Sequence, residues 1–104
     1  MVSKIPVTVE RIVDALCADY DRRRNAISSG GLESDTDEFY RELNSAIEES
    51  VSESCEEGIR AEMLRDLKLR RGYNRSMMYG ISEGAYKRRK RLAKYIIARR
   101  LNYI

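Results

Sequence analysis

The chain has 104 residues, a length that suits one small domain, and its 20 Lys and Arg outnumber 17 Asp and Glu to give a net charge of +3. It has no histidine, which excludes histidine-based catalysis and histidine metal sites, and its two cysteines alone cannot complete a zinc site. No signal-peptide pattern and no stretch of ~20 apolar residues is present, so we expect a cytoplasmic protein without a membrane partner.

The first predicted helix runs from Val9 to about Ile27. Thr8 is its expected N-cap, and Glu10 lies in the first turn, where a carboxylate interacts favourably with the helix dipole. Gly30 and Gly31 then end it, because glycine adopts left-handed backbone angles at little cost. Its apolar stripe comprises Val9, Ile12, Val13, Leu16, Tyr20 and Ile27, with Cys17 at the edge.

A second helix is predicted to begin near residues 35–37, with Ser34 and Asp37 in a capping-box-like pair. Its stripe comprises Phe39, Leu43, Ile47, Val51, Cys55, Ile59, Met63 and Leu67. Steps of four residues make this stripe drift by about 40° each time, so one straight face cannot hold it. Either the helix breaks within residues 50–58 and its halves pack on different partners, or an unbroken helix of about 54 Å builds a dimer.

The C-terminal segment alternates turns and helices. Residues 71–74 form a predicted turn, residues 75–79 a short helix, and Gly80 with Ile81 a second turn. Ser82 is the expected N-cap of a last helix that runs to about Leu101, with Glu83 in its first turn. The apolar stripe of this helix comprises Ala85, Tyr86, Leu92, Ala93, Ile96, Ile97, Leu101 and Ile104.

This order of short helix, glycine turn, capped helix and basic residues is typical of a helix-turn-helix. Gly80 supplies the turn, Ile81 fills the angle between the helices, and Tyr86 faces the core. The last helix then presents its N-terminal residues to the major groove of DNA. The candidate DNA-binding residues are Ser82, Lys87, Arg88, Lys90, Arg91 and Lys94, with Arg71 and Arg75 on flanking phosphates.

Charge divides the chain into two predicted regions. Residues 32–66 hold twelve acidic and three basic side chains, whereas residues 67–104 hold twelve basic ones and a single acidic one, Glu83. We therefore expect a helical hairpin over 1–66, a candidate dimerisation region, and a basic helix-turn-helix over 67–104. A solvated basic face, an anionic membrane surface, and pairing with the acidic helix remain alternatives for the basic residues. The acidic helix is interpreted as a solvated face, a competitor of DNA, or a surface for RNA polymerase.

The stretch Tyr79–Ile104 resembles the DNA-binding end of phage and prophage transcriptional regulators of the ArpU/RinA type, which in turn resemble region 4 of bacterial sigma factors. The matching features are Gly80-Ile81-Ser82, the aromatic Tyr86, the basic run 87–91, and the apolar residues Leu92, Ala93, Ile96 and Ile97. One departure is Arg89, which lies three residues after Tyr86, where a helix-turn-helix usually has an apolar residue.

Together these features predict an all-α, sequence-specific DNA-binding transcriptional regulator of phage or prophage origin. Double-stranded DNA is its expected partner, and a homodimer would suit a palindromic site. The alternative is a helical protein–protein interaction module, for phage packaging or the transcription machinery. We predict no enzymatic activity, no catalytic residues, no metal site and no cofactor.

Overall fold

The computed structural model describes residues 4–76 and 80–104, and over these residues the chain is all-helical, as predicted. Its helices are α1 (Val7–Ala18), α2 (Tyr20–Ser29), α3 (Ser34–Ser54), α4 (Arg60–Leu69) and α5 (Glu83–Arg100). Single turns of 3₁₀-helix lie before and after α4, at Glu57–Ile59 and Tyr73–Arg75. Within the described ranges, no helix combines the length and the apolarity that crossing a bilayer requires.

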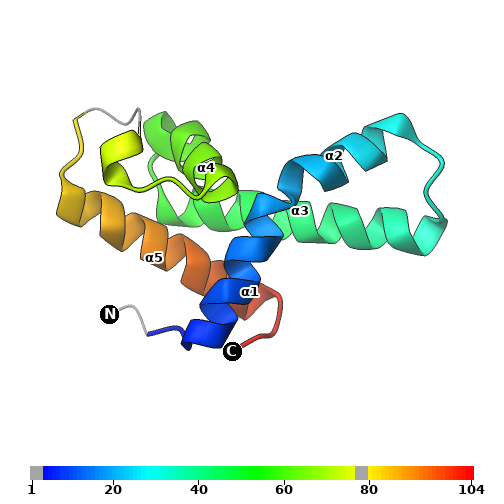
Figure 1. Cartoon of the computed structure of the whole chain (residues 1–104), viewed down its shortest axis with the longest axis horizontal. Coiled ribbons are helices and arrows are strands. Elements are labelled where there is room, and N and C mark those ends of the chain that lie inside the picture. Colours follow the sequence, from blue (N-terminus) through cyan, green and yellow to red (C-terminus); the bar gives the residue numbers. More distant parts are fainter. Residues whose placement is uncertain (1–3, 77–79) are drawn as a thin grey trace.

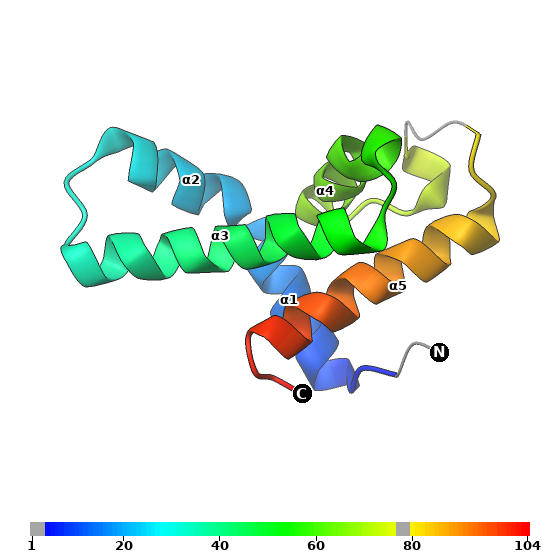
Figure 2. The same cartoon turned by 180° about the vertical axis from the view of Figure 1, so that it is seen from behind.

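Helix α3 runs along most of the longest dimension of the molecule, which is 43 Å (Figure 1). The N-terminal half of α3 pairs with α2 to form a protruding arm, which we call the α2–α3 arm. The C-terminal half of α3 lies beside α5. Helix α1 crosses α3 and contacts α4 and α5 (Figure 2). Residues from both charge-defined segments, 1–66 and 67–104, therefore share one core.

The drifting apolar stripe of the second predicted helix is explained by a break. Helix α3 ends at Ser54, and Cys55 is extended, with φ −130° and ψ 146°. Helix α4 then folds back, so that Met63 and Leu67 enter the same core as Ile47 and Val51. The predicted break within residues 50–58 is confirmed. The break is expected because an apolar stripe that rotates along a helix cannot face one neighbour over its whole length.

The first predicted helix is two helices that bend at Asp19, which has φ −90° and ψ 2°. A continuous helix would pair the Leu16 carbonyl with the amide of residue 20, but this carbonyl accepts a hydrogen bond of 2.6 Å from Arg23 Nη2. The Arg23 side chain is 1% exposed, so it needs acceptors inside the protein. The sequence pattern did not reveal this bend, because an arginine within Arg22-Arg23-Arg24 suggests a solvated surface.

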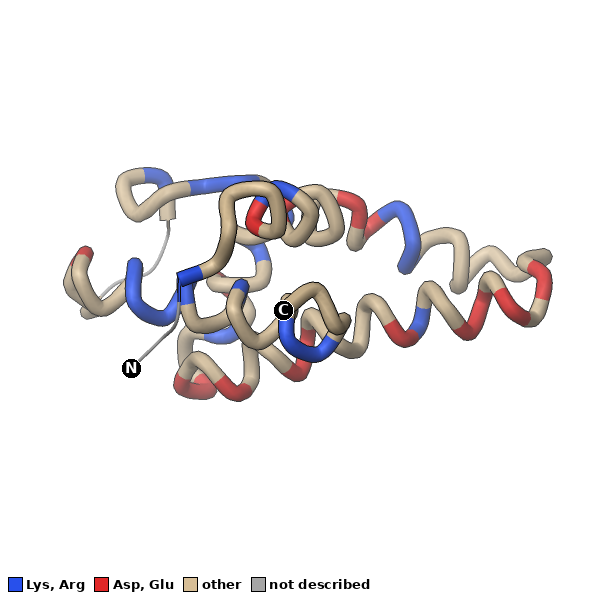
Figure 3. The backbone as a smooth tube through the Cα atoms, turned by 90° about the horizontal axis from the view of Figure 1, so that it is seen from below, with Lys and Arg blue, Asp and Glu red and all other residues tan. Residues whose placement is uncertain are grey.

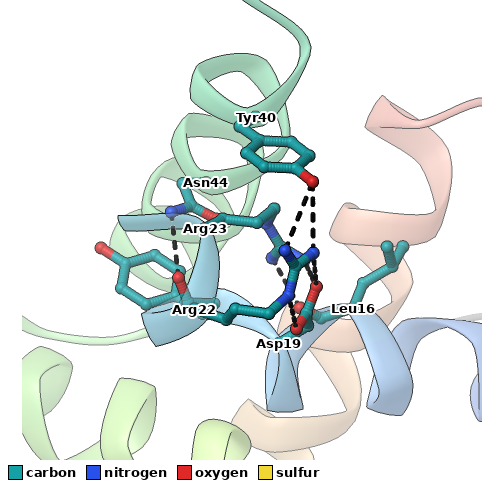
Figure 4. A network of polar contacts seen from close by, with 7 residues as sticks. Leu16, Asp19, Arg22, Arg23, Tyr40 and Asn44 are labelled. Atoms are coloured by element: carbon teal, nitrogen blue, oxygen red, sulfur yellow. Dashed lines mark hydrogen bonds and ion pairs between the residues drawn. The ribbon is translucent and has the colours of Figure 1, made fainter. Parts of the chain in front are cut away.

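Three groups satisfy the buried Arg23 guanidinium (Figure 4). Besides the Leu16 carbonyl, Nε donates to Asn44 Oδ1 at 2.8 Å, and Nη1 lies 3.3 Å from Asp19 Oδ2. Burial lowers the pKa of Arg23 from its usual value, and the Asp19 carboxylate opposes this shift. Asn44 Nδ2 also donates to the Tyr20 carbonyl at 3.3 Å, so Asn44 joins the bend to α3.

Several local expectations are corrected. Helix α1 begins at Val7 rather than after Thr8, because the Pro6 carbonyl already accepts from the Glu10 amide at 2.9 Å. Ser34 is the first helical residue of α3 and not its cap, and Asp37 Oδ1 pairs with Arg41 Nε at 2.5 Å.

Core membership also differs from the predicted stripes at a few positions. Cys17 lies in the core and not at its edge, and burial raises the pKa of its thiol to about 12. Ile12 and Phe39 are 37% and 56% exposed, because α1 and the tip of the α2–α3 arm have no further helix against those faces.

The Arg23 network predicts a measurable loss of stability on Asn44→Ala. This change removes the acceptor of Arg23 Nε and leaves a buried charged donor unpaired, so the free energy of unfolding falls by about 1–3 kcal/mol. Urea denaturation followed by circular dichroism measures the change. The matched control Asn25→Ala, at an exposed position of α2, stays within about 0.5 kcal/mol of the wild type. Equal effects of both variants would contradict a specific role of the network.

Candidate nucleic-acid interface

The start of α5 is held by a side-chain cap and a glycine turn, as predicted. Ser82 Oγ accepts a hydrogen bond of 3.1 Å from the Ala85 amide. Gly80 has φ +78°, a left-handed angle that other residues adopt only with strain, and the Ile81 carbonyl accepts from Tyr73 Oη at 3.0 Å. The Ser82 side chain is thus the helix cap, and its exposed hydroxyl keeps an O–H donor for a ligand.

The helix that precedes this turn differs from the prediction. The described residues place Tyr73–Arg75 in one 3₁₀ turn and leave Ser76 extended, with φ −73° and ψ 146°. An α-helix therefore does not begin at Arg75, and the rest of the predicted helix, residues 77–79, lies outside the described residues. The chain turns before this point because Arg70, at the end of α4, adopts a left-handed conformation with φ 55° and ψ 42°.

Tyr86 fixes the N-terminal half of α5 to α4, and its predicted core position is confirmed. It is 1% exposed, and its hydroxyl lies 3.0 Å from Asp66 Oδ2 and 3.2 Å from the Arg71 carbonyl oxygen. Burial and the Asp66 carboxylate raise the pKa of Tyr86 above its usual value. Its ring also packs against Tyr73, with centroids 5.6 Å apart. These contacts determine which face of α5 points away from the core.

The side of α5 that faces α3 is neutralised by glutamates. Arg89 forms an ion pair with Glu56, just after the end of α3, and Arg100 pairs with Glu49 at 2.8 Å and with Glu53. The predicted pairing of the acidic helix with the basic helix therefore occurs within the chain. The hydrogen bond with Arg89 lowers the pKa of Glu56 to about 2.

The side of α5 that faces α1 holds two of the predicted DNA contacts in internal interactions. Lys94 Nζ lies 2.9 Å from Asp14 and 3.0 Å from Glu10, and its side chain is only 14% exposed. Lys90 donates to the Arg71 carbonyl and lies over the Tyr86 ring, 5.7 Å from its centroid. Lys90 and Lys94 thus help to hold α5 in place. The charge pattern of the sequence cannot distinguish such lysines from lysines on a free surface.

The outward side of α5 carries the cations that remain available. Lys87, Arg88 and Arg91 are exposed, and among the described residues Lys87 pairs with Glu83 of the preceding turn, at 2.8 Å. Within residues 4–76 and 80–104, neither Arg88 nor Arg91 has a carboxylate partner. Arg75 is also exposed, whereas Arg71 is half-buried. We call Lys87, Arg88 and Arg91 the α5 outer cations.

Acidic residues recur along the α3 side of the α2–α3 arm, where the backbone tube is red at several positions (Figure 3). Asp35, Glu38 and Glu42 are exposed there and, within the described ranges, have no cationic partner. The described residues hold no group of three or more carboxylates or thiols that could bind a metal ion. The arm is therefore an acidic surface, separated from the α5 outer cations.

The capping role of Ser82 predicts the effect of Ser82→Ala. Loss of the acceptor for the Ala85 amide lowers the free energy of unfolding by about 1 kcal/mol and increases fraying of α5. Chemical denaturation and amide hydrogen exchange measure both effects. Ser82→Asp, which keeps an acceptor, preserves stability, as does Ser45→Ala at an exposed site within α3. A fully stable Ser82→Ala variant with unchanged exchange at residues 83–86 would show that the cap is unimportant.

The ion pair of Arg89 predicts a shifted titration of Glu56. In the wild type its carboxyl group titrates at a pKa of about 2, so the pair stabilises the fold above the usual carboxyl pKa and is lost as the pH falls through about 2. Arg89→Gln returns the pKa of Glu56 toward the ordinary glutamate value of 4.5, while Arg99→Gln, an exposed α5 control, leaves it low. Carboxyl ¹³C NMR measures both. An ordinary Glu56 pKa in the wild type would disprove the pair in solution.

With this geometry established, the chain was compared with known proteins. No protein-family model, no curated protein and no solved structure matches it.

Proposed function

We propose that the chain binds double-stranded DNA through the outward side of α5, as a sequence-specific transcriptional regulator of the phage and prophage type that residues 79–104 resemble. The observation that carries the proposal is that, among the described residues, Arg88 and Arg91 have no carboxylate partner, whereas Arg89, Lys94 and Arg100 of the same helix are paired. Leaving such charges unpaired suits a polyanionic partner, because their neutralisation by phosphates releases counterions.

The chemistry of the outer cations suits DNA. Arginine forms bidentate hydrogen bonds with phosphates and with the major-groove edge of guanine, and a major groove about 12 Å wide accommodates an α-helix. Arg88 and Arg91 lie one turn apart near the capped start of α5, so both reach one groove segment. Lys87 and Arg75 are the flanking phosphate contacts. Lys90 and Lys94 act by positioning α5, and a second copy of the chain would supply the other half-site.

One observation favours a second candidate function, a protein-interaction module. The α2–α3 arm exposes Phe39, at 56%, beside the unpaired Asp35, Glu38 and Glu42. An exposed aromatic ring among carboxylates suits a basic protein surface with an apolar pocket, and RNA polymerase remains one candidate. Both functions are compatible within one regulator, because the arm and the α5 outer cations occupy different parts of the molecule (Figure 3).

A salt titration of DNA binding tests the proposal. If Lys87, Arg88, Arg91 and Arg75 neutralise about four phosphates, the log–log slope of affinity against salt is about −3 to −4. Arg88→Ala with Arg91→Ala reduces the slope by about 2 and weakens binding to every sequence, because two phosphate or base contacts disappear. Gel shifts at several salt concentrations, on random and selected duplexes, measure these changes.

The matched control is Arg24→Ala with Arg41→Ala, which removes the same charge from the α2–α3 arm. It retains the wild-type affinity and slope if the α5 outer cations form the interface. Equal losses of DNA affinity in both double variants would show that binding depends on the net charge of the protein and not on the α5 outer cations. Absence of any shift at about 50 mM salt would favour the protein-interaction module.

A further inference from the structure

A groove runs between α1 and α5 beside the α5 outer cations. It consists of two adjoining hollows of about 150 Å³ and 190 Å³ that share Lys90 and Lys94 as their common wall. Arg70 and Asp14 line the first hollow, and Glu10 and Arg91 line the second. We call these two hollows the α1–α5 groove.

Positive charge exceeds negative charge in the α1–α5 groove. Asp14 and Glu10 are both engaged by Lys94, at 2.9 Å and 3.0 Å. Arg70 lies 4.0 Å from Asp14, at the limit of an ion pair, and Arg91 has no carboxylate partner among the described residues. Among the described residues, the Lys90 ammonium group contacts the Arg71 carbonyl and the face of the Tyr86 ring. Concave surfaces lined by one sign of charge concentrate the field and attract the opposite ion.

The lowered pKa of Lys90 agrees with an excess of positive charge in the α1–α5 groove. Burial lowers its pKa first, and the neighbouring Lys94 charge lowers it further, while Asp66 and Asp14 oppose the shift less strongly. A half-buried ammonium group beside a second one is electrostatically unsatisfied, and an anion within the groove would relieve both effects.

We propose that the first hollow of the α1–α5 groove binds a phosphate group, held by Arg70 and Lys90, with Lys94 in the same wall. A phosphate oxyanion suits this hollow because the Arg70 guanidinium, at the end of α4, and the Lys90 ammonium group, on α5, both line it. The guanidinium of Arg70 reaches the groove because its backbone turns the chain at the end of α4. The phosphate belongs either to a DNA backbone that passes α5 or to a small phosphorylated ligand, and the groove does not depend on the DNA-binding proposal.

A titration with inorganic phosphate at constant ionic strength tests the groove in the full chain. Saturable amide shifts are expected at residues 10–14, 70–71 and 87–94, together with a rise in the Lys90 pKa observed through its ¹⁵Nζ signal. Arg70→Asn weakens binding about tenfold, since it removes a charge-assisted contact. This variant suits the left-handed backbone at position 70, because asparagine tolerates that conformation. Lys90→Met serves as a second variant.

Arg24→Asn is the matched control, since it removes one exposed charge from the α2–α3 arm, and it changes phosphate affinity less than about twofold. Gel shifts then identify the source of the phosphate. A salt slope reduced by about 1 in Arg70→Asn assigns the groove to the DNA backbone, and an unchanged slope assigns it to a small phosphorylated ligand.

Two results would overturn the proposed phosphate site. One is a set of phosphate-induced amide shifts spread evenly over the surface, and the other is an equal loss of phosphate affinity in Arg70→Asn and Arg24→Asn. Failure of Arg88→Ala with Arg91→Ala to affect DNA binding would overturn the DNA-binding interface alone, because neither residue lines the first hollow, where the phosphate is proposed to bind.

Discussion

The structure depends on neutralising α5, a helix that carries eight lysines and arginines within 18 residues and still packs into the core. Like charges three or four residues apart on a helix repel one another, so such a helix needs carboxylates around it. Helix α3 supplies Glu49 and Glu53 for Arg100, the segment after it supplies Glu56 for Arg89, and α1 supplies its two carboxylates for Lys94. Tyr86 anchors the remaining side to α4.

Two interruptions of the helices make this surrounding possible. At the bend near Asp19, the Leu16 carbonyl accepts a hydrogen bond from the buried Arg23. The bend lets α1 cross beside α5 while α2 continues along α3. The break at Cys55 returns α4 to the core and leaves Glu56 next to Arg89. The helix-turn-helix expected from the sequence would have an apolar residue at the position of Arg89. In the structure, Glu56, just after α3, forms an ion pair with Arg89 there.

Neutralisation from two sides divides the basic residues by role. Lys90, Lys94, Arg89 and Arg100 hold α5 between its neighbours, and the outer cations remain for a partner. The proposed DNA interface and the α1–α5 groove adjoin along α5, because Arg91 lines the second hollow of that groove. Because the acidic arm lies at the other side of the molecule, an anionic partner at α5 and a basic partner at the arm would not compete directly (Figure 3).

The sequence by itself determined the helical class, the Ser82 cap and the inward Tyr86, and it limited the second helix to a break within residues 50–58 or an unbroken dimer helix. Each depends on local chemistry or on the 3.6-residue period, which the order of residues carries. The tertiary structure decided the rest. It alone distinguished paired from free cations on α5, placed Arg23 inside and Phe39 outside, and brought Arg70 into the groove with Lys90. Those outcomes depend on which distant carboxylate or helix lies opposite each side chain, and a helical period contains no information about that neighbour.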